Sequence, residues 1–426
     1  MAQDMFRPPV NRAMPRILDN KNISKCRAEL QRSKDSLHLE RLGSIHPDPV
    51  ESEAKRGRRC ILLRPETRDS GEPYPWSPKV SELVEDNLIN VIPYELHLTY
   101  DYWNYHEIAS AILPEGDEEE IPSGFTLVGH VAHLNLRDKY LRYKDIIGEL
   151  LVDKNPGVRT VINKVDDVGE ESEYRTFRYE VLAGPNDMDV EIREADCTFR
   201  FNYAKVYWNS RLNTEHQALV EAFQEGEAVC DVMAGIGPFA VPAGKKQVFV
   251  WANDLNPDSY SSLEDAIQRN KVGEFVRPFN ENALTFIRTA ASELLKTEHK
   301  VNIFKKQSHP QDSDPATRFN HYVMNLPATA VTFLPSFVGL YNESERKELP
   351  ADLKLPMIHV YCFSTKSDDN VQEGIKICQE ISKQLNYEVT PQTPELTIHD
   401  VRDVAPNKRM FRASFRLPEE VAFRAR

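Results

Sequence analysis

The sequence predicts an α/β protein in which a doubly wound, mostly parallel sheet is preceded by smaller α+β domains. Two observations carry this prediction. From about residue 213 onward, amphipathic helical segments alternate with short apolar strands, which is the pattern of βαβ units. Before that point, residues 125–203 read as several strands with one helical segment between them. Ligands of doubly wound sheets bind beyond the carboxyl ends of the strands.

Length and composition place limits on the protein class. A chain of 426 residues is long enough for two or three domains with buried cores. No stretch approaches the roughly 20 apolar residues of a membrane span, so we expect no membrane partner. The six cysteines form no CxxC pair, which argues against a disulfide scaffold and against a metal site. The net charge of −13 argues against coating of nucleic acid through bulk positive charge but allows a local basic groove.

We expect three domains, with boundaries at 1–113, 114–203 and 204–426. The first begins with a basic arm, and the acidic stretch 114–120 reads as an exposed linker. The second contains a helix at 143–152 and strands at 125–131, 160–165, 175–182 and 191–203. The third contains helices at 215–223, 260–270 and 371–385, strands at 228–233, 247–252, 321–325, 357–363 and 410–417, and a surface insertion at 305–317.

A glycine-rich turn follows the first strand of the third domain. Gly235, Gly237 and Ala240 fit the pattern G-x-G-x-x-G/A. Asp254 ends the next strand, where a carboxylate can accept both ribose hydroxyls of an adenosine. Either feature alone is a weak signal, because a glycine pair is more often a tight turn. Together they favour a nucleoside cofactor.

The residues around this turn favour one cofactor class. A carboxylate at Asp231 would repel a pyrophosphate but suits a cationic sulfonium, and Pro238 alters the helix start that a dinucleotide needs. Two late strands joined by a tight connection also point to the antiparallel hairpin of methyltransferase sheets. We therefore predict S-adenosylmethionine rather than a nicotinamide dinucleotide. Asn282, beyond the third strand, could bond the adenine edge or simply form a turn.

Two further segments carry polar residues toward the same edge of the sheet. Asn325 and Pro327 end the fourth strand, where they either face the cofactor and a flat base or merely terminate the strand. In the segment 205–216, Thr214 could cap the helix that begins there, which places Glu215 and His216 in its first turn. A glutamate at that position is more often a partner of the helix dipole than a base.

Taken together, the segments 129–136, 207–216, 231–239, 253–257, 325–327 and 401–406 resemble the eukaryotic and archaeal tRNA (guanine-37-N1)-methyltransferases. The likeness covers about residues 91–418. It implies a Rossmann-like class I methyltransferase domain with a seven-stranded sheet behind two smaller RNA-contacting domains. It also implies transfer of the methyl group of S-adenosylmethionine to the guanosine 3′ of the anticodon, with the anticodon loop and body of tRNA as partner. We expect a monomer that acts in cytoplasm and nucleus, with a mitochondrial pool compatible with the basic start.

The resemblance also assigns roles to residues. It makes Glu215 the general base and Arg175 the group that stabilises O6, with Tyr207, Asn325 and Pro327 completing the catalytic set. Guanine N1 becomes a nucleophile only when its proton leaves, and charge then builds on O6. The cofactor-binding set, from the resemblance and from the motifs above, is His216, Asp231, Gly235, Gly237, Asp254, Leu255, Asn282, Ala283 and Asn325.

Three alternatives stay open. The sister enzymes that transfer an aminocarboxypropyl group in wybutosine synthesis share the scaffold and the cofactor. A non-enzymatic RNA-binding protein and a nicotinamide-dependent dehydrogenase are the others. An RNA substrate further requires that basic side chains gather on one face, for which the candidates are Arg137, Lys139, Arg142, Lys144, Arg159, Lys164, Lys408, Arg409 and Arg412.

Overall fold

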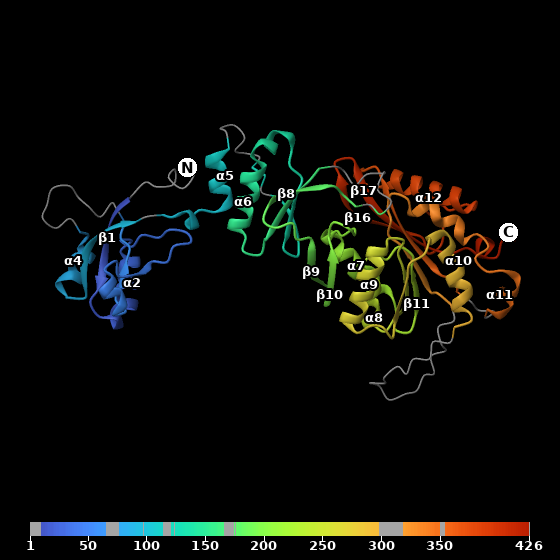
Figure 1. Ribbon diagram of the computed structural model, residues 1–426, viewed down its shortest axis with the longest axis horizontal. Helices are drawn as coiled ribbons and strands as arrows, with labels where there is room; N and C mark the ends of the chain where they lie inside the picture. The colour runs from blue at the N-terminus through green and yellow to red at the C-terminus, as the bar shows by residue number, and fades with distance from the viewer. Residues whose placement is uncertain are drawn as a thin grey trace, which may run out of the picture. The chain divides into compact units, whose positions relative to one another are not determined.

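The computed structural model describes residues 10–64, 76–96, 98–113, 121–122, 124–165, 174, 176–297, 318–349 and 354–425 (Figure 1). The chain divides into two compact units, Met1–Ser123 and Gly124–Arg426. The predicted linker at 114–120, the predicted insertion at 305–317 and Arg175 lie outside the described residues. The three-domain division remains a prediction.

The first unit contains a four-stranded antiparallel sheet in the order β2-β3-β1-β4. Its helices α2 and α4 contribute Cys26, Leu30, Val80 and Leu83 to one apolar cluster with the sheet. The strands are β1 (Val10–Ile17), β2 (Ile45–Pro47), β3 (Arg59–Ile61) and β4 (Ile89–Leu96), and the helices are α2 (Ile23–Arg32), α3 (Glu51–Lys55), α4 (Pro78–Glu85) and α5 (Tyr105–Ile112).

The second unit opens with a small α+β module. Its four-stranded sheet has the order β5-β6-β7-β8, and a separate hairpin pairs β9 with β10. Helix α6 contacts β7 and β8. The elements are β5 (Thr126–Val128), β6 (Val131–Leu134), α6 (Lys144–Lys154), β7 (Thr160–Lys164), β8 (Tyr179–Ala183), β9 (Asp189–Glu194) and β10 (Cys197–Asn202).

Two of the predicted strands in this module are wrong. The segment 125–131 is broken by a turn at Gly129, which has a φ of +57°, so that β5 and β6 form a hairpin. The segment 191–203 is also a hairpin, with Ala195 and Asp196 both at positive φ in its two-residue turn. Such turns need positive φ at both central residues and usually contain Asn or Gly. The Ala195-Asp196 turn therefore contains neither of the two residues that usually predict a hairpin turn. The alternation of apolar residues also continues across it, so the segment resembles a single strand.

The rest of the second unit contains a seven-stranded sheet in the order β13-β12-β11-β14-β15-β17-β16. All neighbours are parallel except β17, which is antiparallel to both β15 and β16. This sheet confirms the predicted doubly wound architecture with a late antiparallel hairpin. The strands are β11 (Ala228–Asp231), β12 (Phe249–Asn253), β13 (Val276–Phe279), β14 (His321–Met324), β15 (Met357–Ser364), β16 (Thr397–Ala405) and β17 (Lys408–Arg416).

Helices cover both faces of this sheet, as parallel strands require. Successive residues of β11 point to opposite faces, so Val229 packs in one apolar cluster with α7, α8 and α9, and Cys230 packs in another with α10 and α12. Figure 1 shows α8 and α9 on one side of β11 and α10 on the other. The helical elements are α7 (Asn213–Ala222), α8 (Ala240–Lys245), α9 (Pro257–Asn270), α10 (Ala283–Leu294), η7 (Ala330–Phe337), α11 (Glu343–Glu348), α12 (Val371–Leu385) and α13 (Glu419–Ala422).

The helix predicted at 371–385 has these bounds in α12, because its apolar residues recur at helical spacing. Among the described helices, none is both long and apolar enough to span a bilayer.

Candidate active site

The glycine loop between β11 and α8 has two glycines with different tasks. Gly235 and Gly237 have φ values of +56° and +94°, which side chains other than glycine rarely adopt. A Cβ on Gly237 would lie 2.7 Å from a methyl group of Leu263 and 2.9 Å from one of Val241, so this glycine lets the loop pack against α9. A Cβ on Gly235 would meet no atom within 4 Å. Gly235 therefore borders open space in which a ligand can approach the backbone.

Hydrogen bonds hold the loops after β11, β12 and β13 together. The Gly235 amide donates to Asp254 Oδ2 at 2.8 Å. The buried Asn253 amide group donates to the carbonyls of Val232, at 3.1 Å, and Glu281, at 3.0 Å. The structure thus brings the predicted residues Gly235 and Asp254 together beside the Asn282 loop. Sequence reasoning gave Asn253 no role, although an amide at the end of an apolar strand was the available signal.

The predicted adenosine contacts have capacity for a ligand. Asp254 Oδ1 also accepts the Asn256 amide, at 2.9 Å, yet a carboxylate has about four acceptor positions and can still receive ribose hydroxyls. The Asn282 side chain caps α10 by accepting from the Leu284 amide at 2.9 Å. Ala283 is the first residue of that helix, where backbone amides lack partners within the helix. Leu255 exposes 48% of its surface beside Asp254.

Asp231 is a buried carboxyl group at the end of β11. It is fully buried, and neither oxygen has a hydrogen-bond partner among the described residues. Burial, and secondarily the charge of Asp254, raise the pKa of Asp231 to about 8. Burial also raises the pKa of Asp254. Two desolvated carboxyl groups at one site favour a cationic ligand over an anionic one.

The helix that carries Glu215 begins differently from the prediction. Thr214 does not cap it: α7 starts at Asn213, and the residue before it, Leu212, makes no side-chain cap. The chain enters α7 through a 3₁₀ turn, η6 (Ser210–Leu212), and the side chain of Asn209 accepts from the Arg211 amide at 3.2 Å. The side-chain cap is therefore Asn209, at the start of the 3₁₀ turn that precedes α7, rather than Thr214. Glu215 still lies in the first turn of α7, as predicted.

Three side chains surround the Glu215 carboxylate. Glu215 Oε1 accepts from the Tyr361 hydroxyl at 2.7 Å and from Arg412 Nη1 at 2.5 Å. Glu215 Oε2 lies 3.4 Å from His399 Nε2. The glutamate is only 5% exposed, whereas the His399 side chain is 51% exposed.

The three partners form one row across the sheet. Tyr361 on β15 is directly opposite Arg412 on β17, and Arg412 is directly opposite His399 on β16. Directly opposed residues project from the same face. Sequence reasoning missed Tyr361 and His399 and saw Arg412 only as a surface cation, because strand register between distant segments leaves no local spacing signal.

The other predicted site residues occupy varied environments. His216 is buried, with its Nδ1 2.6 Å from Glu194 Oε1 and its ring 4.8 Å from that of Phe239, just after the glycine loop. Tyr207 is half exposed. Asn325 directly follows β14, and the Pro327 carbonyl accepts from the Phe363 amide at 3.1 Å. The roles of these residues remain predictions.

For two residues of the predicted basic face, the structure contradicts the prediction. Arg409 and Arg412 are mostly buried, and both pair with carboxylates. Lys144 and Arg159 also pair with carboxylates, but their side chains stay accessible. Apolar-rich strands such as β17 bury the residues of both faces, so a charged residue in them meets a partner inside the protein rather than a phosphate outside.

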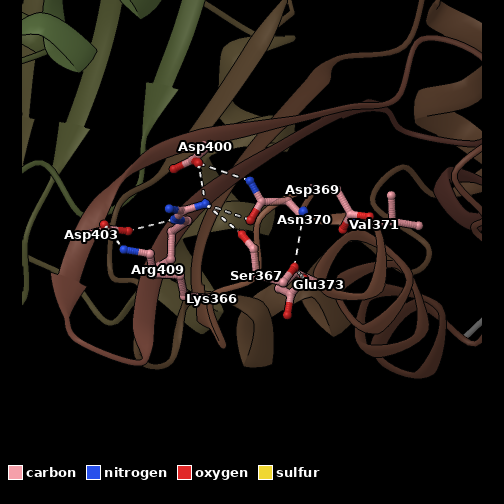
Figure 2. Close-up of polar contacts among 9 residues, drawn as sticks. All are labelled: Lys366, Ser367, Asp369, Asn370, Val371, Glu373, Asp400, Asp403 and Arg409. Atoms are coloured by element: carbon pink, nitrogen blue, oxygen red, sulfur yellow. Dashed lines mark hydrogen bonds and ion pairs between the residues drawn. The ribbon is translucent and has the colours of Figure 1, made fainter.

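A polar network braces the hairpin that carries Arg412 and His399 (Figure 2). Arg409 lies 2.7 Å from Asp403 and 2.9 Å from Asp400 on β16, and it donates to Asn370 Oδ1 at 2.9 Å. Lys366 also pairs with Asp403, at 2.5 Å. Figure 2 shows the β16–β17 hairpin held in this way against the loop between β15 and α12.

The sheet order, the antiparallel last strand and the ligand-facing glycine loop after β11 define the second half of the chain as a class I methyltransferase domain. Known proteins agree with this class. A model of the TYW2 N-terminal domain matches residues 105–187, and one of the TRM5/TYW2 methyltransferase domain matches residues 190–293.

Relatives with assigned names narrow the class. The chain is 52% identical to the tRNA (guanine(37)-N(1))-methyltransferase of Aspergillus fumigatus over an aligned length of 464 residues. The match covers 99% of this chain and 96% of that protein. It is 46% identical to the enzyme of the same name from Schizosaccharomyces pombe, over 80% of this chain and 78% of that protein. The chain therefore belongs to the family of tRNA (guanine(37)-N(1))-methyltransferases.

Solved structures share the fold. Trm5b from Pyrococcus abyssi matches with a TM-score of 0.55 and 21% identity, over 95% of this chain and 98% of that one. The protein chain in a complex of aTrm5 and tRNALeu matches with a TM-score of 0.59 and 17% identity, over 95% of this chain and all of that one.

Proposed function

We propose that this tRNA methyltransferase moves the methyl group of S-adenosylmethionine to N1 of guanosine 37, with Glu215 as the general base. One observation carries the mechanism. A buried carboxylate stands on α7, held on one oxygen by Tyr361 and Arg412, while the next residue, His216, packs on Phe239 of the glycine loop. This arrangement supports the proposal that Glu215 is a fixed proton acceptor near the methyl donor.

The residues around the glycine loop suit the proposed donor. The open space at Gly235, the free acceptor positions of Asp254 and the buried carboxyl of Asp231 fit an adenosine joined to a cationic group. When bound, S-adenosylmethionine supplies a methyl group that is already activated. The protein then has to align the reacting atoms and remove a proton.

Glu215 supplies the proton acceptor. Guanine N1 carries a proton at neutral pH, and a carboxylate within about 3 Å can take it. Since Oε1 is engaged twice, Oε2 is the oxygen available to the guanine edge. Negative charge then develops on O6, where we propose that Arg175 donates. Tyr207, Asn325 and Pro327 are proposed to orient the extruded base, because a base in a loop must be turned out to react.

The proposed tRNA partner is supported by the family and by the complex of aTrm5 with tRNALeu. The division into two RNA-contacting domains and a catalytic domain, the monomeric state, and action in cytoplasm and nucleus with a mitochondrial pool are proposals drawn from the resemblance.

Methyl transfer to an unmodified tRNA transcript tests the function. With methyl-labelled S-adenosylmethionine, we expect label in a transcript that has guanine at position 37 and none in the same transcript with adenine there. The product should be N1-methylguanosine after nuclease digestion. Absence of methyl label from the RNA, together with incorporation from a cofactor labelled in its aminocarboxypropyl part, would support the sister activity. Equal methylation of both transcripts would contradict the assigned target.

A further inference from the structure

We infer that His399 receives the proton that Glu215 takes from guanine and passes it to solvent. This inference rests on the proposed function, because it concerns the step that follows proton removal. After each transfer, a buried carboxyl group holds a proton that must leave before the next turnover. Glu215 is 5% exposed, and a bound base would cover it further, so the proton needs a route through a neighbouring side chain.

Of the three described side chains around Glu215, only His399 can accept the proton. The Arg412 guanidinium has no acceptor atom and stays protonated. Burial and the charge of Glu215 raise the pKa of Tyr361, so its hydroxyl keeps its proton and donates it to Oε1. Imidazole is the side chain that takes up and releases protons near neutral pH.

The geometry connects the right atoms. His399 Nε2 lies 3.4 Å from Oε2, the oxygen that Tyr361 and Arg412 leave available. Contacts of this kind are often long before the substrate binds. Half of the His399 side chain is exposed, since β16 is an edge strand of the sheet. One end of the imidazole therefore faces the acid and the ring also reaches water.

The proton balance closes without another reactant. The N1–H bond breaks, its electron pair remains on N1 for the new bond to the methyl carbon, and the proton moves to Glu215 Oε2. The bond between that methyl carbon and the donor's sulfur breaks, and its electron pair stays on the sulfur, which leaves as a neutral thioether. That proton then moves to His399 Nε2, and the imidazolium loses a proton to water.

The test follows methyl transfer and proton release separately in single turnovers of the full-length protein with a tRNA transcript containing guanine 37. Labelled methyl groups report the first event, and an indicator dye in weak buffer reports the second. In the wild type we expect both at the same rate. In His399→Ala we expect proton release to lag behind methyl transfer and steady-state turnover to fall about tenfold. Added imidazole should abolish the lag.

Controls separate a relay from packing. Thr397→Ala changes a residue of the same strand two positions away and should show no lag. His399→Gln keeps the size of the side chain but cannot relay, so it should show the lag without needing any repacking. Coincident methyl transfer and proton release in both His399 variants, or a loss that imidazole does not restore, would overturn the inference. Neither result would affect the assignment of Glu215, whose own failure would appear as an unchanged transfer rate in Glu215→Gln.

Discussion

Glu215 is a charged group that the fold has enclosed, and its partners determine whether it can work. Arg412 supplies the opposite charge at 2.5 Å, with 15% of its side chain exposed. Removing one partner of a buried ion pair leaves an uncompensated charge. We expect Arg412→Ala to lower the free energy of unfolding by about 3–5 kcal/mol, measured by urea denaturation, and to slow methyl transfer because the carboxylate is no longer held.

A matched control is Arg200, which pairs with Glu191 across an exposed hairpin at 2.9 Å. Surface pairs contribute about 0–1 kcal/mol, so Arg200→Ala should stay in that range. An equal loss in both variants would mean that the Arg412 pair has no special energetic role.

Asp231 makes the stability of the folded protein depend on pH in the opposite direction from an ion-paired aspartate. Its pKa is about 8 in the folded protein, against about 3.9 in an unfolded chain. The folded state therefore keeps the proton longer, and the stability that this provides is present below about pH 4 and is lost as the pH rises to about 8. We expect the urea midpoint of the unliganded protein to fall between pH 5 and pH 8, and to fall less in Asp231→Asn. Parallel pH profiles for the two proteins would contradict this environment for Asp231.

At the scale of elements, the two glycines of the loop after β11 should respond differently to the same substitution. Gly237→Ala places a Cβ against Leu263 and Val241 and should lower the melting temperature by several degrees. Gly235→Ala adds only backbone strain of about 1–2 kcal/mol, but its methyl group enters the open space. For each variant, the loss of S-adenosylmethionine affinity, measured by calorimetry, is divided by the decrease in melting temperature. We expect this ratio to be larger for Gly235→Ala than for Gly237→Ala. The reverse order would move the ligand away from Gly235.

The hairpin of β16 and β17 depends on ionised carboxylates. Arg409 and then Lys366 lower the pKa of Asp403 to about 2. This stabilisation is present above about pH 4, where the unfolded aspartate is also ionised, and is lost as the pH falls toward 2. We expect Asp403→Asn to lower the urea midpoint at pH 7 and to have little effect at pH 2. Asp265→Asn, in an exposed pair on α9, is the control with a small effect at both values. A deficit of Asp403→Asn that persists at pH 2 would show that the charge is not its cause.

Local patterns carried the sequence predictions that succeeded at this scale. The amphipathic spacing of α12 and the glycine turn after β11 lie within short stretches, so neighbouring residues suffice to predict them. The strands at 125–131 and 191–203 were mispredicted because a two-residue turn can interrupt a strand without changing its alternation. The cap at Thr214 was misplaced because a 3₁₀ turn precedes α7.

At the scale of the whole molecule, the site is assembled from distant segments, and this limits what a sequence shows. The Gly235–Asp254 contact spans two adjacent strands and was predictable from the βαβ rule. The row of Tyr361, Arg412 and His399 depends on the register of β15, β17 and β16 around a residue of α7. A one-residue slip would turn those side chains to the other face. The contacts of these three residues with Glu215 are therefore visible only in the folded structure.

The role of Glu215 as general base is tested by the single-turnover rate of methyl transfer by Glu215→Gln to a tRNA transcript with guanine 37, with S-adenosylmethionine affinity measured beside it. Loss of a general base costs roughly 10²–10⁴-fold in rate. We predict a decrease in that range with cofactor affinity unchanged, because the glutamine keeps the shape but cannot take the proton. A rate equal to that of the wild type would contradict the role of Glu215 as the general base.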